Sequence, residues 1–132
     1  MHALLLPVGD DLYAVETALV REVVAAPELT ALPTAPPSVL GVFNLRGEIV
    51  PVFDLANLLG LGRTPERPFV AVVDTGLGPA GLALTDVARA AEIGEPIAGS
   101  DTPGTIATYS IDKQLAVLID TATLLVPANV TS

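Results

Sequence analysis

Short runs of apolar residues, separated by turn-forming residues, follow one another along the chain. Because Val, Ile, Phe and Leu suit a pleated surface, while Gly, Pro, Asp and Asn suit tight turns, this pattern predicts many short strands. No run is long and periodic enough for crossover helices, so the pattern predicts an all-β protein built from small barrels. We expect strands at residues 3–8, 12–15, 20–24, 41–45, 49–53, 69–74, 80–84, 106–111 and 115–119, a weaker one at 87–93, and a loop at 98–104.

A predicted β-hairpin at residues 41–54 lies at the centre of this pattern. Its tip is Arg46–Glu48, where Gly47 supplies a positive φ at no steric cost. Pro51 has no N–H to donate to a strand ladder, so we expect an edge or a bulge there. Just before the hairpin, prolines hold residues 33–37 in an extended conformation.

The chain contains an internal repeat. Residues 52–59 and 118–125 share one pattern at an offset of 66 residues. In both segments a strand is followed by a short predicted helix, with Asp54 or Asp120 at the N-cap position. The second segment therefore repeats the first, with the same strand, cap and helix.

A second alignment gives nearly the same offset. Residues 14–20 align with residues 81–87 at an offset of 67. Two matches at nearly one offset predict two similar halves of about five strands each, residues 1–60 and 69–127. Residues 60–68, rich in glycine, proline and charge, form the predicted linker, and strands are free to cross between the two barrels.

Composition narrows the functions that this fold can serve. The 132 residues include no cysteine and one histidine, His2, so we expect no disulfide, no metal site and no histidine-based triad. No glycine-rich element opens a helix, so no cofactor site is predicted. Six basic and fifteen acidic residues give a formal net charge of −9, which disfavours nucleic acid and anionic membranes as partners.

The mean hydropathy of +0.61 is high enough to raise the question of a membrane protein. The longest stretch without a charged residue, 29–45, contains three prolines and cannot form a spanning helix. The first seven residues lack the positive charge and the long apolar core of a secretory signal. We therefore expect a cytoplasmic protein that does not insert into a membrane.

One motif supports an enzyme as the alternative. Asp74-Thr75-Gly76 resembles the Asp-Thr-Gly of retroviral-type aspartic proteases, and residues 120–122 are a degenerate second copy. Two carboxylates that share one proton would supply the general acid and the general base for peptide hydrolysis. The simpler interpretation is a turn after a strand and a helix cap at Asp120, and we favour it because such a tripeptide arises easily by chance.

The central stretch resembles the signature of the CheW family, the coupling proteins of bacterial chemotaxis. In that family a Leu-Pro-x-x-Pro run precedes the strand-turn-strand Gly-Val-x-Asn-Leu-Arg-Gly-x-Ile-Val-Pro-Val-x-Asp-Leu. So many matched positions in fixed register make the resemblance specific, and it covers nearly the whole chain as a single domain of residues 1–132. The matching positions are Leu32, Pro33, Pro36, Gly41, Val42, Asn44, Leu45, Arg46, Gly47, Ile49, Val50, Pro51, Val52, Asp54 and Leu55.

This resemblance implies two five-stranded SH3-like barrels that share a core, and a scaffold without catalytic activity. Such a scaffold would couple the cytoplasmic hairpin tip of a methyl-accepting chemoreceptor to the regulatory domain of a CheA-type histidine kinase. It would then be recruited to receptor arrays at the membrane. The alternative within this class is a divergent scaffold of a non-flagellar chemosensory pathway, one that controls pili or the synthesis of a second messenger.

The resemblance also implies which residues bind partners. The candidates for receptor or kinase contact are Val20, Glu22, Val23, Arg46, Gly47 and Glu48. Glu22 falls where the family contacts the receptor tip, and Arg46 falls on the family's near-central arginine. The resemblance leaves open whether Glu22 and Arg46 form a salt bridge with each other or contact a partner directly. The residues expected to shape the backbone, with Asn44 bonding the turn, are Pro33, Pro36, Gly41, Asn44, Pro51, Asp54 and Asp120.

The resemblance weakens between residues 80 and 93. Thr85 stands where the family has an aspartate, and Ala90 stands where it has a larger apolar residue. The partner contacts that the family makes through this part of the chain are therefore left open.

Overall fold

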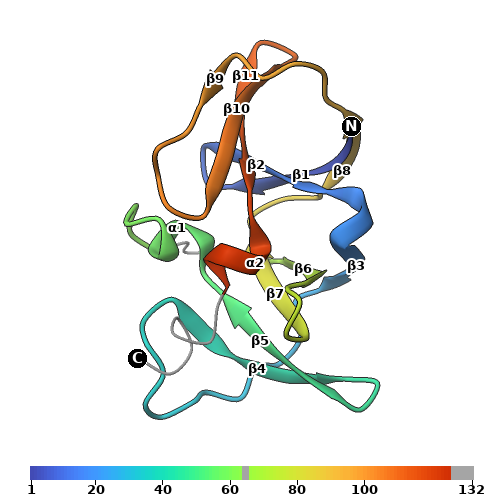
Figure 1. Cartoon of the computed structure of the whole chain (residues 1–132). Coiled ribbons are helices and arrows are strands. Elements are labelled where there is room, and N and C mark those ends of the chain that lie inside the picture. Colours follow the sequence, from blue (N-terminus) through green and yellow to red (C-terminus); the bar gives the residue numbers. More distant parts are fainter. Residues whose placement is uncertain (64–65, 126–132) are drawn as a thin grey trace.

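The computed structural model describes residues 1–63 and 66–125, so residues 64–65 of the predicted linker and 126–127 of the predicted second half lie outside it. Within these ranges the strands form one six-stranded and one five-stranded sheet. Figure 1 shows one sheet above the other, with the short helices α1 (Leu55–Leu58) and α2 (Thr121–Leu124) near their junction. The predicted all-β fold class with two barrel-like sheets is confirmed, with six strands in one sheet where five were expected.

The six-stranded sheet has the order β8-β1-β2-β11-β10-β9. Its pairs are antiparallel except β2 and β11, which run in parallel with Ala14 opposite Leu118. We call this sheet and the side chains that it encloses the six-stranded barrel. Its strands are β1 (His2–Val8), β2 (Asp11–Glu16), β8 (Arg89–Glu92), β9 (Ala98–Gly99), β10 (Thr105–Ile111) and β11 (Gln114–Ile119).

The five-stranded sheet has the order β3-β6-β7-β5-β4, and we call it the five-stranded barrel. A 3-10 turn, η1 (Thr17–Leu19), leads into its first strand. Here β5 and β7 form the parallel pair, with Val52 opposite Gly81. Its strands are β3 (Val20–Ala25), β4 (Val39–Leu45), β5 (Glu48–Phe53), β6 (Phe69–Asp74) and β7 (Pro79–Leu84).

The internal repeat relates the two sheets through exchanged strands. The parallel pair of Val52 and Gly81 corresponds, at offsets of 66 and 67 residues, to the parallel pair of Leu118 and Ala14. Strand β5 of the first half therefore pairs with β7 of the second half, while β2 of the first half pairs with β11 of the second. Each sheet contains strands of both halves, so neither sheet can form from one half of the sequence.

The two faces of each sheet enter different cores. In β6, Val70 and Val72 face the interior of the five-stranded barrel, while Ala71 and Val73 enter a core between the two sheets. All four are at most 3% exposed. Burial on both faces explains why this strand is an unbroken apolar run instead of an alternating one. A third cluster, around Tyr109, fills the six-stranded barrel.

Two short strands depart from the sequence prediction. The strand β9 (Ala98–Gly99) lies where the sequence predicts a loop, and β8 (Arg89–Glu92) occupies part of the weak run 87–93. Strand β9 is held by backbone pairing with β10, Gly99 opposite Ala107. Two residues without large side chains give no pattern from which such a strand can be predicted.

Candidate functional site

The tip of the β4–β5 hairpin is a two-residue turn. Leu45 pairs with Glu48, so Arg46 and Gly47 form the loop, with φ angles of 50° and 89°. Positive φ at both positions matches the twist of the flanking strands, and glycine adopts it without strain. The Gly47 N–H donates a hydrogen bond of 2.9 Å to Oδ1 of Asn44, which fixes the turn.

Arg46 forms a bidentate ion pair with Glu22 on β3. Its Nη1 lies 2.6 Å from Oε2, and its Nη2 lies 3.1 Å from Oε1. Because β3 and β4 are the two outermost strands of the five-stranded sheet, this pair joins one edge of the sheet to the other. Hydrogen bonds from Arg46 hold the pKa of Glu22 below its ordinary value, and the carboxylate in turn raises the pKa of Arg46. Both groups are therefore charged at neutral pH.

A second arginine, Arg21, connects three strands beside this pair. Its Nε donates to Oδ1 of Asp74 at 2.6 Å, and its Nη1 donates to Oε1 of Glu48 at 2.9 Å. These bonds, that to Asp74 first, raise the pKa of Arg21. Since Asp74 ends β6 and Glu48 begins β5, one side chain bridges β3, β5 and β6. We call Arg21, Glu22, Arg46, Glu48 and Asp74 the charged rim.

Arg21 is a rim residue that the sequence did not predict as a site residue, and Asp74 was predicted only as a catalytic carboxylate of the protease alternative. In a regular strand, Arg21 and Glu22 would point to opposite faces. The pairing of β3 with β6 shifts register between Val20 and Glu22, and such a bulge re-aims the side chain beside it. The sequence around residue 21 carries no signal for this shift.

The apolar site candidates lie along β3. Val20 pairs with Val73 and is half-buried, while Val23 pairs with Ala71 and is 39% exposed. On the neighbouring hairpin, Ile49 follows the rim residue Glu48 and is 61% exposed. The rim is therefore flanked by apolar side chains that face solvent.

Gly41 lies where the chain comes close to itself. A Cβ on Gly41, whose φ is 148°, would lie 2.8 Å from the carbonyl oxygen of Thr30. This close approach results from a bridge in which Thr30 and Val42 exchange backbone hydrogen bonds of 2.8 and 2.9 Å. Glycine at this position allows the loop before β4 to rest on the strand.

The prolines occupy turns and a strand. Pro33 lies in a turn in which the Ala35 N–H donates to the Leu32 carbonyl at 3.2 Å. The carbonyl of Pro36 accepts a hydrogen bond of 2.9 Å from Val39, the first residue of β4. Pro51 lies in β5 opposite Val42, and the register shift of this hairpin falls between Val39 and Gly41 instead.

Asp54 and Asp120 occupy equivalent positions at the starts of α1 and α2. Oδ1 of Asp54 accepts a hydrogen bond of 3.3 Å from the Asn57 N–H. Oδ1 of Asp120 accepts the corresponding bond of 3.4 Å from the Thr123 N–H. Both side chains thus satisfy backbone donors that the first turn of a helix leaves unpaired.

The two aspartates of the protease alternative have partners of their own. The Asp74 carboxylate accepts a hydrogen bond from Arg21, and the Asp120 carboxylate accepts one of 2.8 Å from the Thr123 hydroxyl. The Thr75 hydroxyl donates to the Gly78 carbonyl at 2.8 Å, as in an ordinary turn. An aspartic protease needs two carboxylates that share one proton, and these two are engaged elsewhere.

Across residues 1–63 and 66–125, no three or more His, Cys, Asp or Glu side chains come together in a way that could hold a metal ion. None of the helices in these ranges has the length and the apolar character required to cross a membrane.

Two barrel-like sheets around a shared core, with a braced charged rim, define a double-barrel β-domain. A family model described as "CheW-like domain" matches residues 2–128. The chain therefore belongs to the CheW-like domain family, and the resemblance seen in its sequence is confirmed. This membership replaces the protease alternative: Asp74 ends β6, and Thr75 and Gly76 belong to the turn that leads into β7.

A solved structure shows the same fold. The crystal structure of the scaffolding protein TtCheW from Thermoanaerobacter tengcongensis matches with a TM-score of 0.83 at 24% sequence identity. The match covers 97% of this chain and 89% of that chain. At this level of identity, the likeness shows the architecture of the two barrels.

Curated relatives match over shorter segments. The chain is 43% identical over 54 residues to the probable chemotaxis protein CheW of Rhizobium etli, and 40% identical over 47 residues to the chemotaxis protein CheW of Treponema pallidum. These segments cover 41% and 36% of this chain. In the relatives they cover 35% and 28%, so the chain spans about a third of the length of the curated relatives that it matches.

Proposed function

We propose that this protein is a non-catalytic adaptor that couples chemoreceptors to a CheA-type histidine kinase. It holds the regulatory domain of the kinase beside the cytoplasmic hairpin tip of the receptor, so that signals pass between the two proteins. Membership of the CheW-like family supports this proposal, as do relatives that are named chemotaxis proteins. The protein works in the cytoplasm and is recruited to receptor arrays at the membrane.

The observation that carries the proposal is the exposure of Arg46 within its ion pair. The Arg46 side chain is 71% exposed, whereas that of Glu22 is 30% exposed. A guanidinium has five N–H groups, and Glu22 accepts from two of its nitrogens. Glu22 thus fixes the direction of the planar fork, and the outward N–H groups meet a carboxylate or carbonyl on the receptor tip.

The remaining site candidates complete the receptor surface. Val20 and Val23 supply apolar contact along β3, and Gly47 and Glu48 supply the edge of the hairpin turn. Apolar contact of this kind gives affinity, whereas the charges set register and specificity. The ion pair between Glu22 and Arg46 therefore both joins the strands and orients Arg46 toward the receptor.

The test is a binding assay with a CheA-type kinase and a receptor cytoplasmic fragment from the same cell. The wild-type protein captures both, and the folded variants Arg46→Ala and Glu22→Ala lose the receptor. Arg89→Ala is the matched control, because it removes an exposed arginine from an ion pair of the other barrel. If the folded wild-type protein captures neither partner, the coupling role is wrong, and a divergent scaffold of a non-flagellar pathway takes its place.

A further inference from the structure

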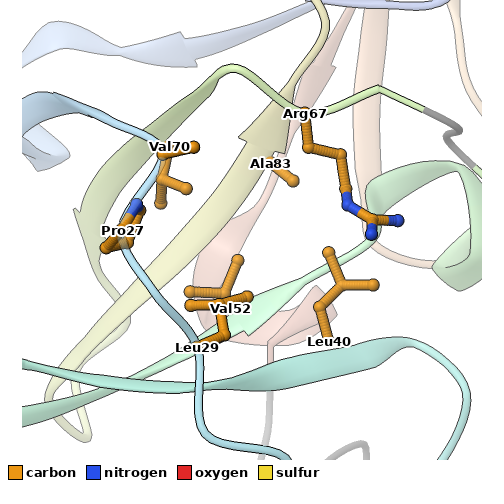
Figure 2. A pocket seen from close by; sticks show the side chains of 8 residues that line it. Pro27, Leu29, Leu40, Val52, Arg67, Val70 and Ala83 are labelled. Carbon is orange, nitrogen blue, oxygen red and sulfur yellow. The ribbon is translucent and has the colours of Figure 1, made fainter.

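The five-stranded barrel contains a pocket of about 270 Å³ at the end away from the charged rim. Figure 2 shows aliphatic side chains around it, among them Leu29, Leu40, Val52 and Val70. The floor is formed by buried side chains, since Val52 is 0% and Val70 3% exposed. The Arg67 side chain lies along one side, with its guanidinium beside Leu40.

The internal repeat identifies a position at which this pocket has a smaller side chain than the other barrel. The Ala26 N–H donates to the Pro68 carbonyl at 2.8 Å, and the Ile93 N–H donates to the Met1 carbonyl at 2.8 Å, with both pairs related by an offset of 67 residues. Ala26 and Ile93 are therefore equivalent positions in the two barrels. Ile93 is 2% exposed and belongs to the core of the six-stranded barrel, while Ala26 is exposed at the pocket.

A second equivalent pair enlarges the space. Val52 of the pocket corresponds to Leu118, which is 1% exposed in the core of the six-stranded barrel. The five-stranded barrel thus has smaller side chains at these two positions, whereas Val70 of the pocket is larger than its counterpart Ala3. A solvent-accessible pocket whose floor is aliphatic is suited to a bound group with an apolar tail.

We propose that this pocket binds a small aliphatic carboxylate. The aliphatic tail enters between Leu40, Val52 and Val70, in the space that Ile93 and Leu118 fill in the other barrel. The carboxylate rests on the guanidinium of Arg67, whose planar fork suits it. Ligand sites commonly combine such an apolar cavity with one or two polar groups that fix orientation.

Size and charge define the ligand further. One water-sized volume is about 30 Å³, so the pocket of about 270 Å³ accommodates roughly eight to ten non-hydrogen atoms, as in a carboxylate of six to eight carbons. The net charge of −9 repels anions in general, which makes the local positive charge of Arg67 the determinant of carboxylate binding. A guanidinium has five N–H donors, so Arg67 can donate to the ligand carboxylate in addition to the contact that it makes within the chain.

The pocket is separate from the surface proposed for the receptor. Arg21 and Glu22 stand near the start of β3, whereas Ala26 follows its last residue, Ala25. Likewise Leu40 lies near the start of β4, at the opposite end from the turn that carries Arg46. Ligand binding is therefore measurable on the protein alone and stands or falls independently of the adaptor role.

The test is calorimetric titration of the full chain with octanoate, octanol and acetate. Octanoate binds, octanol binds about tenfold or more weakly because it lacks the charge, and acetate does not bind because it lacks the tail. Arg67→Met abolishes the preference for octanoate over octanol, while Arg63→Met, the matched loss of a neighbouring arginine, changes nothing. Ala26→Ile, which copies Ile93, abolishes the binding of both ligands and raises the melting temperature.

A second measurement keeps the proposal testable if a variant fails to fold. Intermolecular nuclear Overhauser effects between the octanoate methyl group and the Val52 and Leu40 methyl groups locate the ligand in the wild-type protein. Absence of octanoate binding overturns the proposal, as does unchanged binding in folded Ala26→Ile. Equal affinity for octanoate and octanol in the wild-type protein overturns the role of Arg67 and with it the proposed ligand class.

Discussion

Arg46 and Asp112 occupy equivalent positions at the tips of two hairpins, and each pairs with a side chain of opposite charge on an outer strand. Their φ angles are 50° and 49°. Arg46 pairs with Glu22 on β3, and Asp112 pairs with Arg89 on β8 at 3.5 Å. The repeat has kept the ion pair between hairpin tip and outer strand and has reversed its charges. An ion pair forms whether the hairpin tip carries the positive or the negative charge. The sign of the charge at the tip can therefore be set by what the partner requires.

Reversing the charges of Glu22 and Arg46 should separate the structural role of this ion pair from its role in recognition. In the double variant Glu22→Arg, Arg46→Glu the ion pair is rebuilt, so we expect a melting temperature within about 2 °C of the wild type, since exposed pairs contribute little to stability. Receptor binding should weaken by about tenfold or more, because a charge-assisted contact is replaced by repulsion. Calorimetric melting and titration with a receptor fragment measure the two effects.

The control is the same operation in the other barrel. The double variant Arg89→Asp, Asp112→Arg should melt like the wild type and should bind the receptor fragment normally. Equal loss of binding in both double variants would show that the charge reversal acts through the overall field and not through Arg46.

The pH dependence of stability should report the ion pair. The pKa of Glu22 is lowered in the folded protein from an ordinary value of 4.5. A lowered folded-state pKa means that the contribution is complete above the unfolded value and is lost as pH falls through the folded value. The difference in melting temperature between wild type and Glu22→Gln should therefore be constant from pH 7 to about 5.5 and shrink below about 4.5.

Melting curves at pH 7, 5.5, 4.5 and 3.5 provide this comparison. Arg46→Met removes the other partner, so its difference from wild type should follow the same pH profile. A difference that stays constant down to pH 3.5 would mean that the ion pair is not what the substitutions remove.

Much of this fold could be predicted from the sequence, because apolar periodicity and turn residues determine local structure. The hairpin at Arg46 and the helix starts at Asp54 and Asp120 each depend on neighbouring residues. The repeat offset further indicates that the two halves resemble one another. It does not indicate that β5 pairs with β7 and β2 with β11, since a likeness between segments carries no information on which of them come into contact.

Only part of the site could likewise be predicted from the sequence. Glu22 and Arg46 lie within motifs that the sequence displays, and the structure pairs them. The bonds of Arg21 to Asp74 and Glu48 depend on a bulge in β3 and on contacts between distant strands. Such contacts become visible when the register of the sheet is known.

Gly41→Ala should destabilise the protein by about 3 kcal/mol. The new Cβ would lie 2.8 Å from the Thr30 carbonyl oxygen, and the φ of 148° is itself unfavourable for alanine. Urea denaturation at 25 °C measures the loss. Gly9→Ala is the matched control, because Gly9 also has a positive φ, of 63°, but a Cβ there meets no atom within 4 Å. Its cost should be about 1 to 2 kcal/mol, and an equal cost at both positions would exclude the contact with Thr30 as the cause.

The two equivalent caps should differ in their contribution to stability because their burial differs. Asp54 is 0% exposed, whereas Asp120 is partly exposed. Loss of an N-cap costs about 1 kcal/mol, and leaving buried donors unpaired adds to that cost. We therefore expect about 1 kcal/mol for Asp120→Ala and about 2 to 3 kcal/mol for Asp54→Ala in urea denaturation.

Asparagine tests whether the cap or the charge is responsible. Asp54→Asn keeps an oxygen that can accept the Asn57 N–H, so it should recover more than half of the stability that Asp54→Ala loses. If Asp54→Asn is as damaging as Asp54→Ala, the negative charge and not the cap is what the buried position requires. The same pair of substitutions at Asp120 should differ less, because water can replace the lost acceptor at a partly exposed helix start.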